Sequence, residues 1–314
     1  MTCCSWLCSP WFWLADVLLG LLLIEFALFK TKSVRRVDEA RDSKYPAFRR
    51  NDTQYWTRPR LYLAAPIVLP RFFLALSSMA VAVGLIQVLL IGLPAGTRAA
   101  GFRLLTMRFL TKAAARWMLF FGGGMITYTL ERPKADYSAY LGPDWKASYG
   151  TTSTIVANHQ SWADILLITI LKFPSFTPKV EIKKWPLFGK ASDIVFNSYF
   201  INRAGTPEER EKIVIDLCKR QEELEKGDAP PLIMFPEGCT TNNTQLIQFR
   251  RGAFFGLHSV QPFTFRYYSP YVSLPHDILN PVAHMILCCC QPYSTAVVKE
   301  LPVFKPNEFF FKNH

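Results

Sequence analysis

The cysteines of this 314-residue chain lack the spacing of a metal site. Neither of their clusters has Cys-x-x-Cys pairs or a suitably spaced histidine, which argues against zinc and leads us to expect no bound metal. The two clusters are Cys3, Cys4, Cys8 and Cys288, Cys289, Cys290. A disulfide framework is not expected at this length and composition, so we predict reduced thiols facing the cytosol. The first cluster lies beside an apolar segment and is a candidate for palmitoylation.

Other signals are missing as well. No basic start or small-residue cleavage site accompanies the first apolar run, so we expect a retained anchor rather than a signal peptide. No internal repeat, low-complexity segment or nucleic-acid motif is present, and we predict no nucleic-acid partner. Charged residues make up only 19% of the chain and hydrophobic residues 50%, with a formal net charge of +12. A chain that is both apolar and basic suggests a membrane protein that faces anionic lipid or a polyanionic substrate.

The N-terminal part divides by composition. Trp11–Phe29 is nearly long enough and apolar enough to cross a bilayer, although Asp16 and Glu25 interrupt it. Residues 30–60 hold ten Lys or Arg and four Asp or Glu and lack apolar periodicity. We therefore predict a membrane anchor over 1–29 and a basic, loop-like cytosolic linker over 30–69.

The most hydrophobic segment is Phe72–Leu93, and a basic, amphipathic stretch follows it to Arg116. We assign 70–130 to membrane-embedded and amphipathic helices, the latter on an anionic membrane surface. Both flanks of 72–93 are basic, which leaves two topologies open. The segment enters one leaflet and returns, bending near Gly84, which we favour, or it spans and residues 117–130 span back.

Residues 131–314 have the pattern of a soluble α/β domain. We predict strands at 153–157, 179–182, 194–202, 230–235 and 260–267, and helices after residue 162 and after a cap at Thr206. Alternation of strands and helices predicts a mixed, largely parallel sheet with helices on both faces, preceded by N-terminal membrane-embedded helices.

A short turn between a buried strand and a helix carries His159 and Asp164. A histidine at a strand end and an aspartate on the first helical turn can meet, giving a general base and the carboxylate that orients it. Alone, the pattern is short and also fits a surface histidine in an ordinary turn. Three further clusters stand at predicted strand ends, where α/β proteins build their sites: Phe200–Arg203, Phe235–Gly238 and Val260–Pro262.

Together and in this order, the four blocks resemble the membrane-bound glycerolipid acyltransferase family, the lysophospholipid and glycerol-3-phosphate acyltransferases. Two departures stand out: Asn197 occupies a position where the family usually has glycine, and no arginine follows Gly238, where Cys239-Thr240-Thr241-Asn242 stands instead. The stretch from Leu246 to Tyr267 is most similar to the lysophosphatidylcholine acyltransferase branch.

The resemblance implies transfer of a fatty acyl group from acyl-CoA to the hydroxyl of a lysophospholipid, with no tightly bound cofactor. It implies His159 as the base and Asp164 as its partner, with backbone amides around Gly238 as donors to the carbonyl oxygen. The substrate-binding residues it implies are Lys179, Arg203, Glu237, Gly238, Thr240 and Pro262. Partners would be acyl-CoA, the acceptor and membrane lipids, in an integral membrane protein of the endoplasmic reticulum whose catalytic domain faces the cytosol. Alternatives are a glycerol-3-phosphate or lysophosphatidic acid acyltransferase, and a non-catalytic lipid-binding relative.

Overall fold

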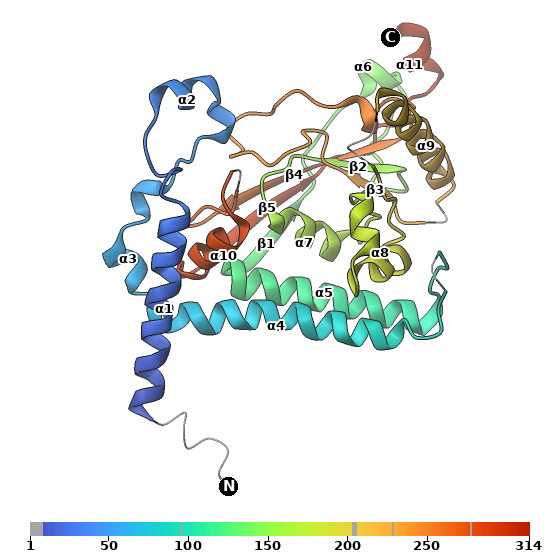
Figure 1. Cartoon of the computed structure of the whole chain (residues 1–314). Helices are drawn as coiled ribbons and strands as arrows, with labels where there is room; N and C mark the ends of the chain where they lie inside the picture. Colours follow the sequence, from blue (N-terminus) through green and yellow to red (C-terminus); the bar gives the residue numbers. More distant parts are fainter. Residues whose placement is uncertain (1–8, 95, 203–205, 228, 277) are drawn as a thin grey trace.

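A five-stranded sheet forms the centre of the protein (Figure 1). The structure is a computed structural model that describes residues 9–94, 96–202, 206–227, 229–276 and 278–314. The strand order is β1-β5-β4-β2-β3; the strands are β1 (Met125–Glu131), β2 (Thr154–Ala157), β3 (Leu232–Met234), β4 (Val260–Tyr268) and β5 (Ser294–Glu300). Only β4 and β5 pair antiparallel, and the other three pairs are parallel. The predicted mixed, largely parallel sheet is therefore confirmed.

Helices precede the sheet and connect its strands. The α-helices are α1 (Pro10–Lys30), α2 (Glu39–Lys44), α3 (Arg58–Tyr62), α4 (Ala65–Leu89), α5 (Gly101–Gly123), α6 (Ser138–Leu141), α7 (Trp162–Leu171), α8 (Phe188–Phe196), α9 (Pro207–Glu225), α10 (Pro281–Cys289) and α11 (Glu308–Asn313). Short 3-10 turns are η2 (Pro46–Phe48), η3 (Thr53–Tyr55), η4 (Val180–Lys184) and η5 (Arg251–Ala253).

The alternation of side chains along the strands decides which helix covers which face. Ile155 and Ala157 of β2 join the core that contains Leu167 of α7, with α5 packed behind that helix. On the other face, Thr154 accepts a 2.7 Å hydrogen bond from Gln221 of α9. Helices therefore cover both faces of the sheet, as predicted.

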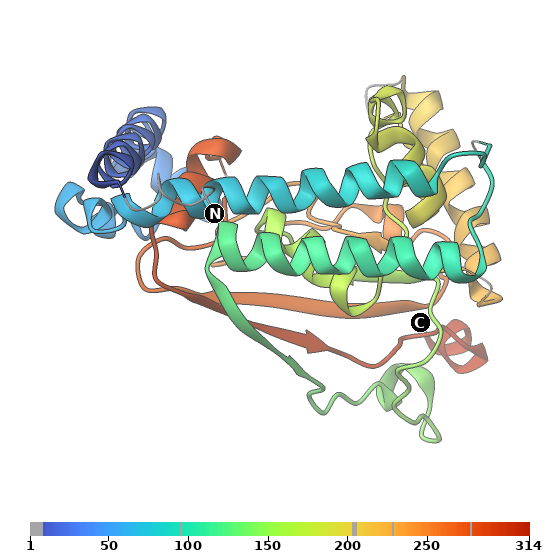
Figure 2. The ribbon, with the colours of Figure 1, turned by 90° about the horizontal axis from the view of Figure 1, so that it is seen from below.

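The long helices α4 and α5 form an antiparallel hairpin alongside the sheet (Figures 1 and 2). Helix α4 continues through Gly84 to Leu89, so the bend expected near Gly84 is wrong. The alternative, a return span over 117–130, is also wrong, because α5 ends at Gly123 and β1 follows directly. Polar backbone that would be costly in lipid is instead paired within the sheet.

We expected the basic side chains of helix α5 to face an anionic membrane surface, but in the structure they face the protein. Its cations contact the protein: Arg116 donates to the carbonyls of Met125 and Ile126, at 2.7 Å each, and Arg108 lies over the ring of Phe173. Its outward positions are apolar and largely exposed, and these are Phe102, Leu105 and Phe109. The basic residues thus hold the hairpin on the domain and leave an apolar surface outside.

Two of the described helices, α1 and α4, are long and apolar enough to cross a membrane by length and composition. Their outward side chains are apolar and more than two fifths exposed, including Trp11, Leu18, Leu22, Phe73, Leu76 and Val88. The helices meet where Gly20 of α1 approaches Ala65 so closely that a Cβ at Gly20 would lie 2.1 Å from its carbonyl oxygen. An alanine at Gly20 would force the two helices apart.

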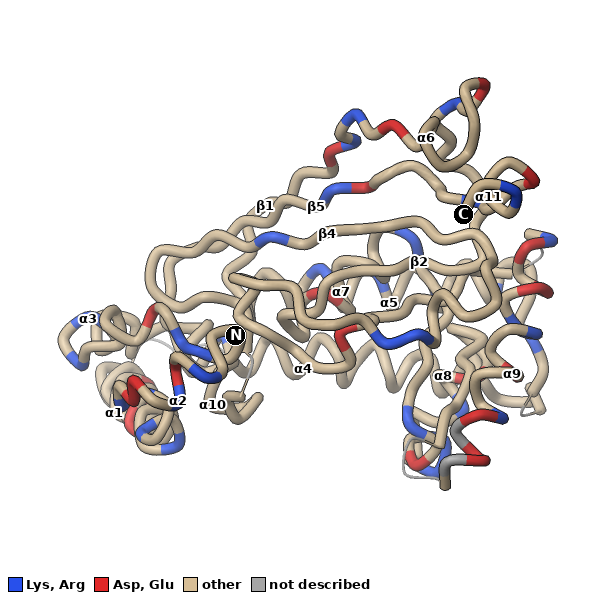
Figure 3. Tube along the Cα trace, turned by 90° about the horizontal axis from the view of Figure 1, so that it is seen from above, with Lys and Arg blue, Asp and Glu red and all other residues tan. Residues whose placement is uncertain are grey.

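The segment between α1 and α4 is more ordered than the predicted loop. It contains α2, η2, η3 and α3, and it buries Trp56 and Leu61 in the main core. Charged residues gather on this segment and around α8 and α9, while the sheet carries few (Figure 3). A net charge of +6 over residues 30–60 gave no sign of this packing.

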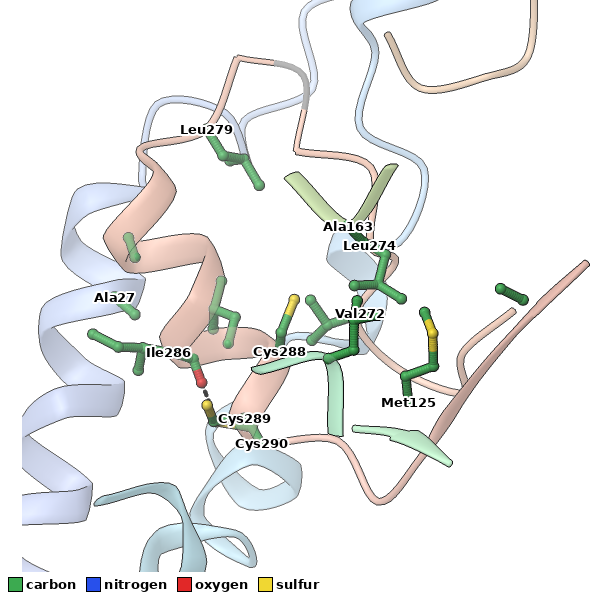
Figure 4. Packing of buried hydrophobic residues seen from close by; sticks show 14 of the residues in the cluster. Ala27, Met125, Ala163, Val272, Leu274, Leu279, Ile286, Cys288, Cys289 and Cys290 are labelled. Atoms are coloured by element: carbon green, nitrogen blue, oxygen red, sulfur yellow. Dashed lines mark hydrogen bonds between the residues drawn. The ribbon is translucent and has the colours of Figure 1, made fainter. Parts of the chain in front are cut away.

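Other expectations also need correction. Residues 179–182 lie at the 3-10 turn η4 rather than in a strand, and most of 194–202 is the end of α8 and a loop. Helix α10 and strands β1 and β5 are additional elements. Helix α10 ends in Cys288, Cys289 and Cys290, which are buried free thiols packed near Met125 and Val272 (Figure 4). Cys3, Cys4 and Cys8 lie outside the described residues.

Candidate active site

The turn between β2 and α7 is built around the carboxylate of Asp164. Ser161 caps α7 through its side chain, and Asp164 at the third helical position bonds back to the Ser161 amide, at 2.9 Å, completing a capping box. The same oxygen, Oδ2, accepts from the Gln160 amide at 2.7 Å and contacts Nδ1 of His159 at 2.9 Å. One carboxylate therefore starts the helix and fixes the imidazole.

The second oxygen of Asp164 has a partner from the sheet. The Tyr267 hydroxyl donates to Oδ1 at 2.6 Å, and Asp164 is 0% exposed. Burial, reinforced by the Asp164 charge, raises the pKa of Tyr267 well above its ordinary value. Tyr267 therefore stays a hydrogen-bond donor at neutral pH, and the buried carboxylate is fully hydrogen-bonded.

The histidine ring is held from both sides. It stacks on Phe235, with centroids 4.1 Å apart, and its side chain is 18% exposed. Because Nδ1 is engaged by Asp164, Nε2 is the nitrogen left for proton transfer. Among the described residues, no hydrogen bond to Nε2 is formed.

Glu237 fixes the backbone of this turn. Its Oε1 accepts from the His159 amide at 2.8 Å, and the residue is only 3% exposed. Burial raises the pKa of Glu237. The Thr241 amide also donates to the His159 carbonyl at 3.0 Å. The loop after β3 thus binds both the amide and the carbonyl of His159.

Two cavities meet at His159. One, of about 580 Å³, is called the polar cavity here because Asn202, Thr240 and Arg250 line it together with apolar side chains such as Ile213 and Leu217. The other, of about 540 Å³, is lined mainly by apolar side chains of α4, α5, α7 and α8. His159, Phe235 and Thr177 line both. The imidazole therefore lies between a cavity of mixed, partly polar lining and a mainly apolar one.

The structure brings most of the predicted site residues to these cavities. Gly238 and Thr240 line the polar one, while Lys179 is exposed at the rim of the apolar one. Glu237 is buried behind His159. Pro262 lies in β4 opposite Val156 and lines neither cavity. Arg203 lies outside the described residues.

Residues that the sequence reasoning missed complete the site. Arg250 lies against Gly238, whose φ of +74° and missing side chain allow it: a Cβ there would meet Arg250 Nε at 2.5 Å. The Gly238 amide itself donates to the Phe235 carbonyl at 3.0 Å, and the donation of amides around Gly238 to a substrate carbonyl stays a prediction. Tyr267 was visible only as a strand residue, since no sequence spacing links it to Asp164.

The described residues contain no group of three or more His, Cys, Asp or Glu placed to hold a metal ion. A histidine with a buried carboxylate on one nitrogen and a cavity beside the other can remove a proton from a hydroxyl group.

The acyltransferase family model matches residues 148–266, which include the His159 turn, the Glu237 loop and most of β4. Residues 148–266 are therefore similar to the acyltransferase family. This segment supplies four of the five groups around the imidazole described above, so the site geometry lies inside the matched region.

Several known acyltransferases are similar to this domain. The lysophospholipid acyltransferase LPEAT1 of Arabidopsis thaliana is 32% identical over 154 residues, 49% of this chain and 39% of that protein. The lysophosphatidylcholine acyltransferase of Drosophila melanogaster is 31% identical over 156 residues, 49% of this chain and 28% of that protein. Lysophosphatidylcholine acyltransferase 1 of Homo sapiens is 30% identical over 155 residues, again 49% and 28%. The chain thus spans less than half the length of these relatives.

Among solved structures, the crystal structure of the 1-acyl-sn-glycerophosphate (LPA) acyltransferase PlsC of Thermotoga maritima is similar, with a TM-score of 0.48 and 16% identity over 76% of this chain and 85% of that one. Within the segment that matches the family model, Asn197 ends α8 with φ +50° and ψ 45°. Glycine suits this left-handed conformation best, and asparagine is the common substitute. The departure from the family pattern noted above is therefore conservative for the backbone.

Proposed function

We propose that the protein transfers a fatty acyl group from acyl-CoA to the free hydroxyl of a lysophospholipid, lysophosphatidylcholine or a related lysolipid. The observation that carries the proposal is the position of His159, which borders a polar and an apolar cavity at once. The substrates have the same division: each joins a long acyl chain to a polar, phosphorylated part.

The reaction requires deprotonation of a weak nucleophile. His159 Nε2 takes the proton of the acceptor hydroxyl while the hydroxyl oxygen attacks the thioester carbon and forms the ester bond. The carbon–sulfur bond then breaks, and the proton passes from the imidazolium to the CoA thiolate. Asp164 keeps Nδ1 protonated and stabilises the imidazolium, as carboxylates do in catalytic triads. General base catalysis of this kind contributes a factor of about 10²–10⁴.

The apolar cavity suits an acyl chain. Its walls include Ala82 and Ile86 of α4, Ala114 and Ala115 of α5, and Phe196 of α8. An acyl chain placed there removes its methylene groups from water and brings its thioester end towards His159. The cavity is lined by the hairpin α4–α5, whose other side is apolar and exposed.

The polar cavity suits the phosphorylated part of a substrate. Arg250 and Thr240 line it beside His159, and Arg250 forms no ion pair with a described carboxylate. A guanidinium can bind two phosphate oxygens at once. Arg250 supplies a cation in a domain that has no arginine directly after Gly238, and Arg203 and Lys179 remain predicted contacts for phosphate groups.

The apolar surfaces of α1 and α4 support placement in a membrane. We propose that α1 is inserted and that α4–α5 lies at the interface, so that lipid substrates reach the apolar cavity without leaving the bilayer. The endoplasmic reticulum, with the catalytic domain on the cytosolic side, fits the basic segment that follows α1. The names of the relatives favour a lysophospholipid acceptor over glycerol 3-phosphate, which lacks an acyl chain.

Purified protein with acyl-CoA and a panel of lysolipids, lysophosphatidic acid and glycerol 3-phosphate tests the proposal. We expect CoA release with a lysophospholipid, and a decrease of about 10²–10⁴-fold in kcat for His159→Ala. The matched control is His314→Ala, because His314 is exposed and lines neither cavity. Turnover unaffected by His159→Ala would overturn the base assignment, and absence of turnover with every acceptor would favour a lipid-binding protein.

A further inference from the structure

The segment of residues 46–52, between α1 and α4, is tied to the catalytic turn although more than half the chain separates it from some of its partners. Arg50 is almost completely buried, with a side chain 2% exposed, and pairs with Asp52 through two bonds of 2.6 and 2.8 Å. The guanidinium also lies over the Trp56 ring, 5.1 Å from its centroid. A buried ion pair on a short connecting segment is costly to desolvate and calls for an explanation beyond stability.

The Arg50–Asp52 ion pair binds the loop 272–276, which in turn contacts the catalytic turn. Arg50 donates to the carbonyls of Ser273, at 2.8 Å, and Pro275, 223 and 225 residues later. Asp52 accepts from the Ser273 amide at 2.6 Å. In the loop 272–276, two backbone carbonyls are therefore bound by Arg50 and one backbone amide is bound by Asp52.

The same loop binds the turn directly. Its Leu274 carbonyl accepts from the Ser161 hydroxyl at 2.7 Å, and its His276 amide donates to the Gln160 carbonyl at 2.9 Å. Gln160 and Ser161 are the two residues whose amides bind Asp164. A displacement of the loop would thus move the donors that orient Asp164, and through it the imidazole.

The segment 46–52 also reaches the loop on the other side of His159. The Asn242 amide donates to the Ala47 carbonyl at 2.8 Å, and the Asn242 side chain donates to the carbonyls of Pro46 and Arg49, at 2.7 Å each. Thr241, the preceding residue, binds the His159 carbonyl. Both loops that grip the catalytic turn are therefore anchored on one N-terminal segment.

We propose that Arg50 and Asp52 are positioning residues for acyl transfer, which hold loop 272–276 and with it the His159–Asp164 pair in reactive geometry. The proposal rests on the proposed function, in which His159 is the base. A misplacement of about 1 Å in an active site can lower the rate by about 10²-fold, so a small shift of the loop is enough. The N-terminal segment then contributes to catalysis as well as to anchoring.

The decisive variant removes the pair without leaving a buried charge. Replacing a buried ion pair by apolar residues of similar volume is often neutral or stabilising, so we expect Arg50→Met/Asp52→Leu to fold, with a Tm lowered only by the backbone groups of Ser273 and Pro275 that lose their partners. It lacks the donors to Ser273 and Pro275. We expect kcat to fall about 10–100-fold with KM changed less than about threefold, because the binding cavities do not contain these residues. Arg50→Lys keeps the positive charge but not the several N–H donors of the planar guanidinium. We expect its kcat to lie between those of the double variant and the wild type.

Arg49→Ala is the matched control, since that side chain is 56% exposed and does not reach the loop. A second readout does not depend on turnover: the rate of carbethoxylation of His159 by diethyl pyrocarbonate, with His314 as internal reference. We expect the carbethoxylation rate of His159 to change at least about threefold in the double variant, because the hydrogen bond between His159 and Asp164 is loosened there. The rate should not change in Arg49→Ala. A folded double variant with wild-type kcat and carbethoxylation would overturn the positioning role. A changed carbethoxylation rate in a protein without turnover on any acceptor would instead support it while contradicting the proposed function.

Discussion

Tyr267 donates a 2.6 Å hydrogen bond to Asp164, on the carboxylate oxygen that His159 does not contact. The two residues are 103 positions apart, one in β4 and one on the first turn of α7. The histidine–aspartate pair is therefore supported from the sheet, and its carboxylate cannot rotate without breaking bonds to both Tyr267 and the turn.

Tyr267→Phe removes that support alone. We expect a loss of stability of about 1.5–3 kcal/mol, typical of a hydrogen bond to a charged group, and a fall in kcat of about tenfold. Because burial raises the pKa of Tyr267, its folded form is protonated where the unfolded form begins to ionise. The contribution of Tyr267 to the free energy of unfolding should therefore be constant below the ordinary tyrosine pKa of about 10 and decrease above it, so the wild type should lose stability more steeply above pH 10 than the variant. Chemical denaturation at a series of pH values measures both effects; equal profiles would contradict the tyrosine assignment.

Glu237→Gln separates hydrogen bonding from charge. The amide oxygen can still accept from the His159 amide, so we expect kcat within about tenfold of the wild type, whereas Glu237→Ala should lose more. Because burial raises the pKa of Glu237, the wild type gains stability as the pH falls through the folded pKa and loses it as the pH rises. The variant should therefore be more stable than the wild type at pH 7 and lose this advantage near pH 4.5, the ordinary value. A variant that is less stable at pH 7 would show that the charge itself holds the turn.

Ala115→Leu should shorten the apolar cavity. Ala115 is buried, 2% exposed, and lines the cavity, whereas Ala113 on the same helix does not. Overpacking costs about 1–3 kcal/mol, so we expect kcat/KM for palmitoyl-CoA to fall about 10–100-fold relative to octanoyl-CoA. Ala113→Leu is the control and should leave the ratio unchanged. An unchanged ratio in both variants would place the acyl chain elsewhere.

Arg250→Ala tests the polar cavity, with Arg251→Ala as its neighbour outside the cavity. Loss of a charged hydrogen bond to phosphate is worth about 1.5–3 kcal/mol, so we expect KM for the acceptor or for acyl-CoA to rise about 10–100-fold. Steady-state kinetics with each substrate varied in turn identifies which one Arg250 binds. If both substrates keep their KM values, Arg250 does not contact a phosphate group.

Leu18→Arg/Leu22→Arg tests insertion of α1. A charge at the centre of a membrane helix costs about 2.5–3.5 kcal/mol on insertion scales, so the double variant should be released from membranes by alkaline carbonate, unlike the wild type. Leu246→Arg, at a leucine 67% exposed on the catalytic domain, is the control and should stay with the membrane. Equal release of all three proteins would contradict insertion.

Local patterns in the sequence were enough to predict much of the fold. The cap at Thr206, with its glutamate three residues on, predicted the start of α9, and the structure shows a capping box there. Apolar runs located β2, β3 and β4. Strand β1 and the end of α8 were missed, because β1 is mostly exposed and Asn197 ends a helix within an apolar stretch that also fits a strand.

The sequence by itself determined the His159–Asp164 pair, since both residues lie within one turn and its helix, and the apolar, basic character of the N-terminal part. Only the tertiary structure decided that Tyr267 supports Asp164, that Arg250 enters the polar cavity, and that Arg50 and Asp52 anchor the loop around the turn. These contacts join residues far apart in the chain, and their geometry depends on sheet order and loop packing, which no local spacing encodes. The same holds for the direction of α5, whose basic side chains turn inwards because carbonyls and an aromatic ring of the domain are there to receive them.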